Sequence, residues 1–192
     1  MAKVQQRTGG RNDGRLYYAV VNGDRETVMS ELRKGDVDLA LRIGGKSFLR
    51  HAGEQGHKGI AMLLIEHGMD PDEVGGKRKH SLLHHASLTH NYGFASVLLE
   101  KQANPTPRSS NNSTPLHIAA RTGQGYLVQK FIDSKSEIDA LDTLGRTPLF
   151  LAITKGHTQL AKMLVNSNGN PKIAARNGVT PLQVAEELGL EL

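Results

Sequence analysis

Apolar residues recur along this chain at a fixed interval. A leucine followed three residues later by an alanine marks each recurrence, at Leu16/Ala19, Leu49/Ala52, Leu83/Ala86, Leu116/Ala119, Leu149/Ala152 and Leu182/Ala185. The leucines lie 33 residues apart, except that 34 residues separate Leu49 from Leu83. A fixed period of this length indicates a solenoid, in which each short unit buries its apolar side against its neighbours. The sequence therefore predicts about six copies of one unit.

A second apolar stripe follows the first within the units. Ile60, Ala61, Leu64 and Ile65 are spaced i, i+1, i+4 and i+5, which places them on one side of a helix. The same spacing returns within residues 94–99 and 160–165. Each unit is therefore predicted to contain two short helices. The one additional residue falls within residues 73–80, where two glycines favour a lengthened turn.

A hexapeptide marks the start of the first helix in the regular units. Residues 114–119 read Thr-Pro-Leu-His-Ile-Ala, and related hexapeptides begin at Thr147 and Thr180. A threonine hydroxyl can cap a helix, and proline suits the first helical position. This hexapeptide at a 33-residue period resembles the ankyrin repeat, from about residue 15 to the end. The resemblance implies an all-α solenoid of about six helix–loop–helix units with projecting β-hairpin loops.

The repeat register also predicts the domain boundaries. Residues 1–14 are polar and interrupted by glycines, which indicates a flexible basic tail. Residues 15–192 are expected to form one elongated repeat domain, with units that start near residues 15, 48, 82, 115, 148 and 181. The first unit has Thr27 and Glu31 where later units are apolar, and the sixth ends before a second helix. Both are expected to act as caps with a wet outer side.

Composition narrows the classes of function. The chain has no cysteine, which excludes a disulfide framework and thiolate metal sites. Its N-terminus lacks the apolar run of a signal peptide, and no window reaches 18 consecutive apolar residues. These features favour a cytoplasmic protein without a membrane span. The net charge of +5 favours acidic partners.

Two motifs suggest phosphate or metal chemistry, but the repeat explains both. Gly45-Lys46-Ser47 is like the end of a phosphate-binding loop, yet the first glycine of that motif would stand at Ala40. In register, residues 45–47 form a turn and a helix cap. His84, His85 and His90 suggest a zinc site. His84, however, occupies the histidine position of the repeat, and in the resembling family this side chain hydrogen-bonds between adjacent turns.

The sequence shows no motif of a catalytic class. No metalloprotease, serine-hydrolase or dinucleotide-binding pattern occurs, so we expect neither catalysis nor a cofactor or metal. His90 replaces the glycine that ends the first helix in other units. A left-handed residue is favoured there, so His90 or Asn91 is expected to be strained.

By resemblance, the hairpin tips and first helices form a concave face that binds another protein. The positions three to six before each marker leucine, and five and six after it, fall on this face. They are rich in cations, with a few apolar residues between them. The residues predicted to bind the partner are Arg42, Ile43, Lys46, Lys77, Arg78, His80, Leu88, Arg121, Leu144, Arg146, Lys155 and Arg176. Arg11 and Lys79 share the register, and the acids at these positions are Asp13, Glu54 and Glu187.

Three functions are compatible with a basic face. The first hypothesis is a monomeric adaptor or inhibitor that binds a partner protein with an acidic surface. The second is binding of nucleic acid or another polyanion, against which the run 77–80 argues, because it lacks interleaved aromatic residues. The third is neutralisation of a toxin or enzyme by occlusion. Charged loops without any binding role are the plain alternative to all three.

Overall fold

The computed structural model describes residues 12–192. Its internal contacts divide the chain into two compact units, one ending at Pro71 and one running from Asp72 to Leu192. The described part of the first unit contains the helices α1 (Asp13–Asn22), α2 (Arg25–Lys34), α3 (Phe48–Glu54) and α4 (Lys58–Glu66). The division lies beside the segment that holds the additional residue.

The second unit begins with a short antiparallel hairpin, β1 (Val74–Gly75) and β2 (His80–Ser81). Its helices are α5 (Leu82–Leu88), α6 (Tyr92–Glu100), α7 (Pro115–Arg121), α8 (Gly125–Asp133), α9 (Pro148–Thr154), α10 (Thr158–Asn166) and α11 (Pro181–Glu187). The helix pairs α5–α6, α7–α8 and α9–α10 are the predicted helix–loop–helix units, so the all-α solenoid is confirmed.

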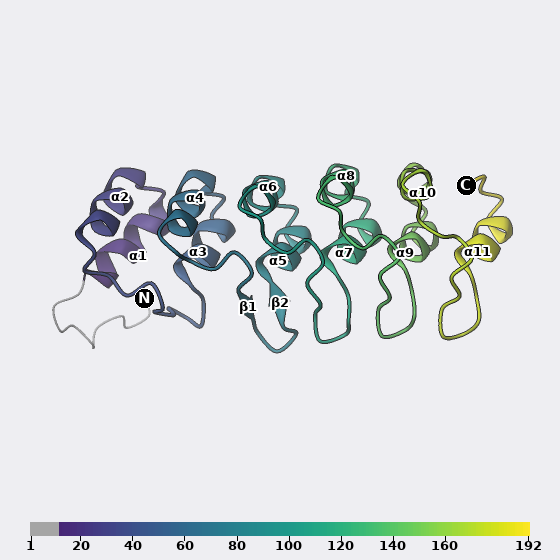
Figure 1. The fold of residues 1–192 in the computed structure, drawn as a ribbon, viewed down its shortest axis with the longest axis horizontal. Helices are drawn as coiled ribbons and strands as arrows, with labels where there is room; N and C mark the ends of the chain where they lie inside the picture. Colours follow the sequence, from purple (N-terminus) through teal and green to yellow (C-terminus); the bar gives the residue numbers. More distant parts are fainter. Residues whose placement is uncertain (1–11) are drawn as a thin grey trace. The chain divides into compact units, whose positions relative to one another are not determined.

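Within the second unit the helices form two layers. The first helices α5, α7, α9 and α11 pack on one another in sequence, and α6, α8 and α10 each pack on the first helix of their own repeat. The connecting loops project from the first-helix layer on the side away from α6, α8 and α10 (Figure 1). In the first unit, α1 packs on α2 and α3, and α4 packs on α2 and α3. The same pairing rule therefore applies in both units.

The core consists of the residues that marked the period. Leu49, Leu116 and Leu149 are fully buried, and Leu83 is 1% exposed. Leu182 in the last repeat is only half-buried. Three phenylalanines are also buried: Phe131 of α8 completely, and Phe48 and Phe94 to within 1%. The register that the sequence predicts is thus the register that the structure adopts.

Side-chain caps begin the first helices as expected. The Thr114 hydroxyl accepts a hydrogen bond from the His117 backbone N–H at 3.3 Å. In the same way, the Thr147 hydroxyl accepts the Phe150 backbone N–H at 3.1 Å and caps α9. Ser47 caps α3 through the Arg50 N–H at 3.0 Å, which confirms the turn-and-cap interpretation of residues 45–47. A cap of this kind contributes about 1 kcal/mol to helix stability.

His90 adopts the strained conformation that its position predicts. Its φ is 55°, in the left-handed region, close to the φ of 73° at Gly123 and 75° at Gly156. The additional residue also lies where it was expected, because the β1–β2 loop has residues 76–79 between its paired strands. The corresponding loop further along has only residues 143–145 between Asp142 and Arg146, which are joined by an N–H···O bond of 3.1 Å.

Two expectations for the first unit were wrong. Helix α1 begins at Asp13, inside the stretch assigned to the tail, because the Asp13 carboxylate accepts the Asp38 N–H at 2.7 Å and fixes this end of the helix. Glu31 does not lie on a wet outer side. It is fully buried, with Lys34 Nζ at 2.8 Å and Arg15 Nε at 3.3 Å from its carboxylate. Two cations thus compensate the buried negative charge of Glu31, at a position that is apolar in other repeats.

Candidate functional site

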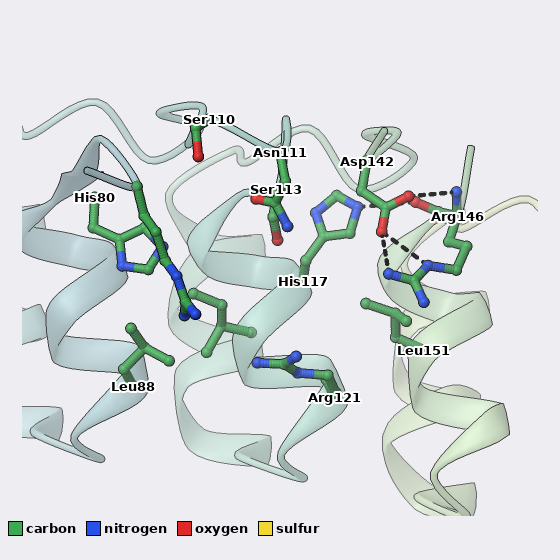
Figure 2. Close-up of a pocket in the computed structure, with 12 residues that line it drawn as sticks. His80, Leu88, Ser110, Asn111, Ser113, His117, Arg121, Asp142, Arg146 and Leu151 are labelled. Atoms are coloured by element: carbon green, nitrogen blue, oxygen red, sulfur yellow. Dashed lines mark hydrogen bonds and ion pairs between the residues drawn. The ribbon is translucent and has the colours of Figure 1, made fainter. Parts of the chain in front are cut away.

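A cavity of about 370 Å³ opens on the hairpin side of the second unit. Three consecutive hairpin loops and the helices α5, α7 and α9 contribute its walls. The lining residues are Arg78, His80, Leu88, Ser110, Asn111, Ser113, His117, Ile118, Arg121, Asp142, Arg146 and Leu151. Figure 2 shows His80 and Leu88 on one side, His117 and Arg121 on the middle helix, and Asp142, Arg146 and Leu151 on the other side. Five of the twelve residues predicted from the sequence line this one cavity.

Two buried histidines join the repeats at the base of the hairpins. His117 Nδ1 lies 2.8 Å from the Thr114 hydroxyl, and its Nε2 lies 3.0 Å from the Arg146 carbonyl oxygen of the next repeat. His84 repeats this arrangement, with Nε2 at 2.8 Å from the Ser113 carbonyl oxygen. The predicted hydrogen bonds between adjacent turns are therefore present. They leave neither ring nitrogen available to a metal.

Burial controls the ionisation of both histidines. It lowers the pKa of His117 to about 4, although the Arg146 carbonyl and the Asp142 carboxylate act to raise it. Burial also lowers the pKa of His84 to about 4, against the opposing effect of the Ser113 carbonyl. Both imidazoles are therefore neutral at pH 7. Their role at the cavity is structural.

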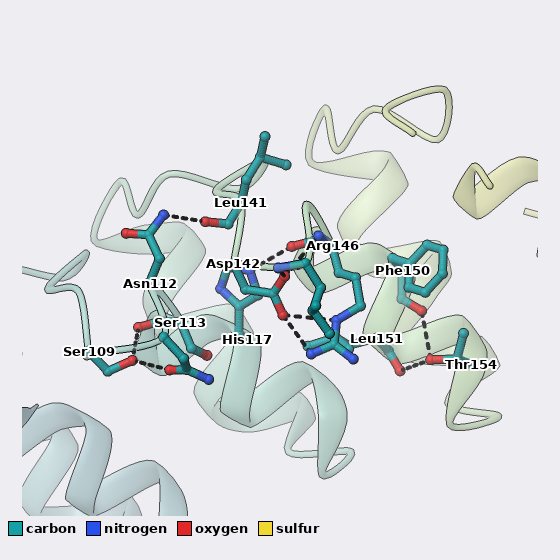
Figure 3. Close-up of polar contacts among 12 residues, drawn as sticks. Ser109, Asn112, Ser113, His117, Leu141, Asp142, Arg146, Phe150, Leu151 and Thr154 are labelled. Atoms are coloured by element: carbon teal, nitrogen blue, oxygen red, sulfur yellow. Dashed lines mark hydrogen bonds and ion pairs between the residues drawn. The ribbon is translucent and has the colours of Figure 1, made fainter. Parts of the chain in front are cut away.

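Arg146 is held by an ion pair within its own hairpin. Its Nε and Nη2 donate to Asp142 Oδ2 at 2.9 and 2.6 Å, and its backbone N–H donates to Asp142 Oδ1 at 2.9 Å (Figure 3). Burial raises the pKa of Asp142, but the hydrogen bonds from Arg146 and from the Leu144 N–H outweigh this effect and leave the pKa lowered. Asp142 thus fixes the position of Arg146 and compensates its charge.

The other cations of the cavity differ from Arg146. Arg78 lies in the β1–β2 loop and Arg121 is the last residue of α7; both are exposed. Among residues 12–192, no acidic side chain forms an ion pair with either of them. Lys77 in the β1–β2 loop, Arg176 in the loop before α11 and Lys155 directly after α9 are also exposed. The positive charge of the cavity therefore comes chiefly from Arg78 and Arg121.

The remaining predicted residues lie outside the cavity. Leu144 is 53% exposed at the tip of its hairpin, and Leu88 at the cavity wall is 39% exposed. In the first unit, Ile43 and Lys46 pair across the Gly44-Gly45 turn, and Lys46 Nζ lies 2.7 Å from the Glu54 carboxylate. Arg42 is exposed beside them. Arg11 lies outside the described residues.

Several neutral residues of the cavity are not apparent from the pattern of charged and large apolar positions. Ser110, Asn111 and Ser113 occupy the register positions used to choose the cations, three to six residues before Leu116. Their small neutral side chains carry neither the charge nor the apolar area that marks the predicted binding residues. Leu151, on the inner side of α9, lies outside that register. The repeat register alone would have found the polar roof of the cavity.

The hairpin tips of the second unit are connected through their backbones. The Ser110 N–H donates to the Arg78 carbonyl at 2.9 Å, the Thr143 N–H to the Asn111 carbonyl at 3.0 Å, and the Arg176 N–H to the Leu144 carbonyl at 2.9 Å. Each tip is therefore hydrogen-bonded to the next. The side chains on the tips project from a connected frame.

Comparison with known proteins identifies the repeat. A family model of ankyrin repeats, in three copies, matches residues 16–109 and 116–191. The chain belongs to the ankyrin repeat family. Such repeats generally mediate protein–protein interaction and are generally not catalytic themselves.

Several curated relatives share the repeat region. Palmitoyltransferase AKR1 of Lachancea kluyveri is 26% identical over 181 residues, which cover 88% of this chain and 24% of the relative. Mouse inversin is 28% identical over 183 residues, covering 93% of this chain and 17% of inversin. An ankyrin repeat-containing protein of Schizosaccharomyces pombe is 39% identical over 79 residues, covering 41% of this chain and 38% of that protein. The chain spans about a quarter of the length of the first relatives.

No helix among residues 12–192 is both long and apolar enough to cross a membrane. The same part of the chain contains no cluster of three or more His, Cys, Asp or Glu side chains placed to hold a metal ion. The three histidines that suggested zinc differ in exposure: His84 is fully buried, His85 is half-buried and His90 is exposed. His90 lies at the exposed end of α5 and packs edge-on against Tyr92, with 6.4 Å between ring centroids.

Proposed function

We propose that this ankyrin repeat protein is a non-catalytic adaptor or inhibitor that binds a partner protein through its basic hairpin side. The supporting observation is the set of exposed cations that form no ion pair with an acid of residues 12–192, above all Arg78 and Arg121. Exposed apolar side chains, Leu88 and Leu144, stand among them. Cations around apolar anchors suit a protein partner with an acidic surface. The cytoplasmic location and the monomeric state stay predictions.

The location of the exposed aromatic residues favours a protein partner over nucleic acid. Non-specific single-strand binding combines cations with aromatic rings on which bases stack. In the second unit, the exposed tyrosines Tyr92 and Tyr126 lie on α6 and α8 and contact each other, with 5.7 Å between ring centroids. They are on the second-helix layer, apart from the hairpin cations. In the described part of the second unit, the exposed tyrosines therefore do not share a surface with the hairpin cations.

The test reverses charges that the fold does not use. Lys46 and Arg146 are unsuitable, because reversal would leave Glu54 and Asp142 beside a new acid. The variant K77E/K155E/R176E instead changes exposed hairpin-side cations that do not line the cavity. A matched control, K135E/K162E/K172E, makes the same change in charge at Lys162 on α10 and at two lysines of the connecting segments that precede the hydrogen-bonded hairpin tips.

Proteins retained from a nuclease-treated lysate by each form are quantified by mass spectrometry, and association rates are then measured with the purified partner. We expect a protein that wild type and the control retain and the hairpin variant loses, with association slowed most at low salt. Equal retention by both variants would refute the proposed face. Retention of proteins from an untreated lysate but not from the nuclease-treated one would instead support a polyanion ligand.

A further inference from the structure

The cavity in the second unit is rich in hydrogen-bond donors. Arg78 and Arg121 enter from different elements and have no ion-pair partner among the described residues. Arg146, held by Asp142, adds a third guanidinium at the opposite wall. A guanidinium has five N–H donors, so Arg146 keeps donors beyond the two that it gives to Asp142. Three such groups around one cavity form a strong site for a negatively charged group.

The hairpin roof adds neutral donors. Asn111 uses its amide oxygen to accept the Ser109 hydroxyl at 2.6 Å, which leaves the amide nitrogen of Asn111 to donate elsewhere. Ser110 contributes a hydroxyl beside it, and its backbone N–H is bonded to the Arg78 carbonyl at 2.9 Å. This backbone bond joins the two loops that carry Arg78 and the neutral donors. The donors around the cavity thus come from connected segments.

Three acceptor groups at the cavity already receive hydrogen bonds. Asp142 receives hydrogen bonds from the Leu144 N–H and from three N–H groups of Arg146. The Ser113 carbonyl lies 2.8 Å from His84 Nε2, and the Arg146 carbonyl lies 3.0 Å from His117 Nε2. A ligand that needed to donate would therefore compete with these bonds. A ligand that only accepts would not compete with them.

Apolar side chains form the floor of the same cavity. Leu88 is 39% exposed, while Ile118 and Leu151 are each 5% exposed. Figure 2 places Leu88 and Leu151 below the polar residues of the hairpins, with Arg121 between them. A free inorganic anion would gain nothing from contact with these apolar side chains. A peptide can cover these apolar side chains with the carbon atoms of the bound residue and with a neighbouring apolar residue.

We propose that this cavity binds a phosphorylated serine or threonine in a segment of the partner protein. The inference rests on the proposed protein-binding function and specifies the chemistry of the partner. One carboxylate is satisfied by a single two-pronged arginine, whereas a phosphate has three acceptor oxygens and a charge of about −1.5 to −2 at pH 7. That charge matches the two cations Arg78 and Arg121, for which the described part of the chain supplies no ion-pair partner. Binding therefore depends on modification of the partner.

The first experiment measures this dependence with the full chain and fluorescent peptide pools of random sequence around one fixed central residue. The fixed residue is phosphoserine, serine or glutamate, and affinity is measured by anisotropy. We expect the phosphoserine pool to bind at least about tenfold more tightly than either other pool, because several charge-assisted bonds distinguish it. In R78Q/R121Q this preference should disappear. The control K162Q, on α10 and outside the cavity, should keep it.

A second measurement reports on the site in the unmodified chain. Addition of N-acetyl-phosphoserine amide should shift the side-chain Nε–H resonances of Arg78, Arg121 and Arg146, and N-acetyl-glutamate amide should shift them less. Absence of shifts, or a phosphoserine pool that binds no better than the glutamate pool, would overturn the inference. A partner from the lysate whose binding needs Lys77, Lys155 and Arg176 but is insensitive to phosphatase would leave the proposed function standing and remove this inference alone.

Discussion

Acid should destabilise the second unit through its two buried histidines. The unfolded state binds a proton on each imidazole near the ordinary pKa of 6.5, whereas the folded state does so only near a pKa of about 4. Between these values the unfolded state binds more protons, so stability falls as the pH falls. The contribution is complete above pH 6.5 and is lost progressively toward pH 4. The physical cause is burial of His84 and His117 as neutral hydrogen-bonded rings.

The size of the effect follows from the two pKa values. At pH 5 an unfolded imidazole is almost fully protonated, and the folded one is not. Linkage then gives a loss of about 2 kcal/mol per histidine between pH 7 and pH 5, or about 4 kcal/mol for His84 and His117 together. A loss of that size is comparable to a large part of the stability of a small domain. It should be easily measurable.

The assay compares wild type with H84Q/H117Q by chemical denaturation at pH 7 and pH 5. Glutamine is the matched replacement, because Gln183 occupies the same register in the last repeat and accepts the Thr180 N–H at 2.8 Å. Any cost of the substitutions at pH 7 cancels when the two pH values are compared for each protein. Wild type should lose about 4 kcal/mol more than the variant. Equal losses would refute the buried, neutral assignment of these histidines.

Two further predictions concern packing. Leu116→Ala and Leu149→Ala should each lower the free energy of unfolding by about 2–5 kcal/mol, while the 53% exposed Leu144 should cost about 0.5 kcal/mol or less when changed to alanine, as measured by denaturation. Gly123→Ala should destabilise more than Gly156→Ala by about 1–3 kcal/mol. Both glycines have φ near 75°, but only at Gly123 would the new Cβ lie 2.7 Å from a ring atom of His157. Similar losses in the two glycine variants would mean that His157 moves aside at little cost.

Much of this fold could be predicted because each position of one repeat can be compared with the same position in the other repeats. The marker leucines, the Thr114 and Thr147 caps and the bonds made by His84 and His117 all follow from register. Contacts made by one repeat alone could not be found in this way. The Asp142–Arg146 pair depends on a tight loop that brings these two residues together, and no other hairpin has the same two residues at these positions.

The burial of Glu31 shows the same limit. A glutamate in a terminal repeat is ordinarily solvated, and only the positions of Arg15 and Lys34 make a buried carboxylate tolerable there. Only part of the cavity lining could be predicted, for a related reason. Selection by charge identified Arg78 and Arg121 but omitted Ser110 and Asn111, whose importance comes from the space that the cations surround. Charge is visible in a sequence, whereas a concave site depends on three hairpins at once.

The connected hairpins bear directly on how such a surface can bind. Loops that must become ordered on binding weaken the affinity, at a cost of about 0.5–1.5 kcal/mol for each immobilised side chain. Here Ser110 is bonded to the Arg78 carbonyl, Thr143 to that of Asn111, and Arg176 to that of Leu144, at 2.9–3.0 Å. These bonds use main-chain atoms only, so the tip side chains can vary without disturbing the frame. In the second unit, the main chain therefore fixes the positions of the hairpin tips. The side chains at those positions are left to determine the partner.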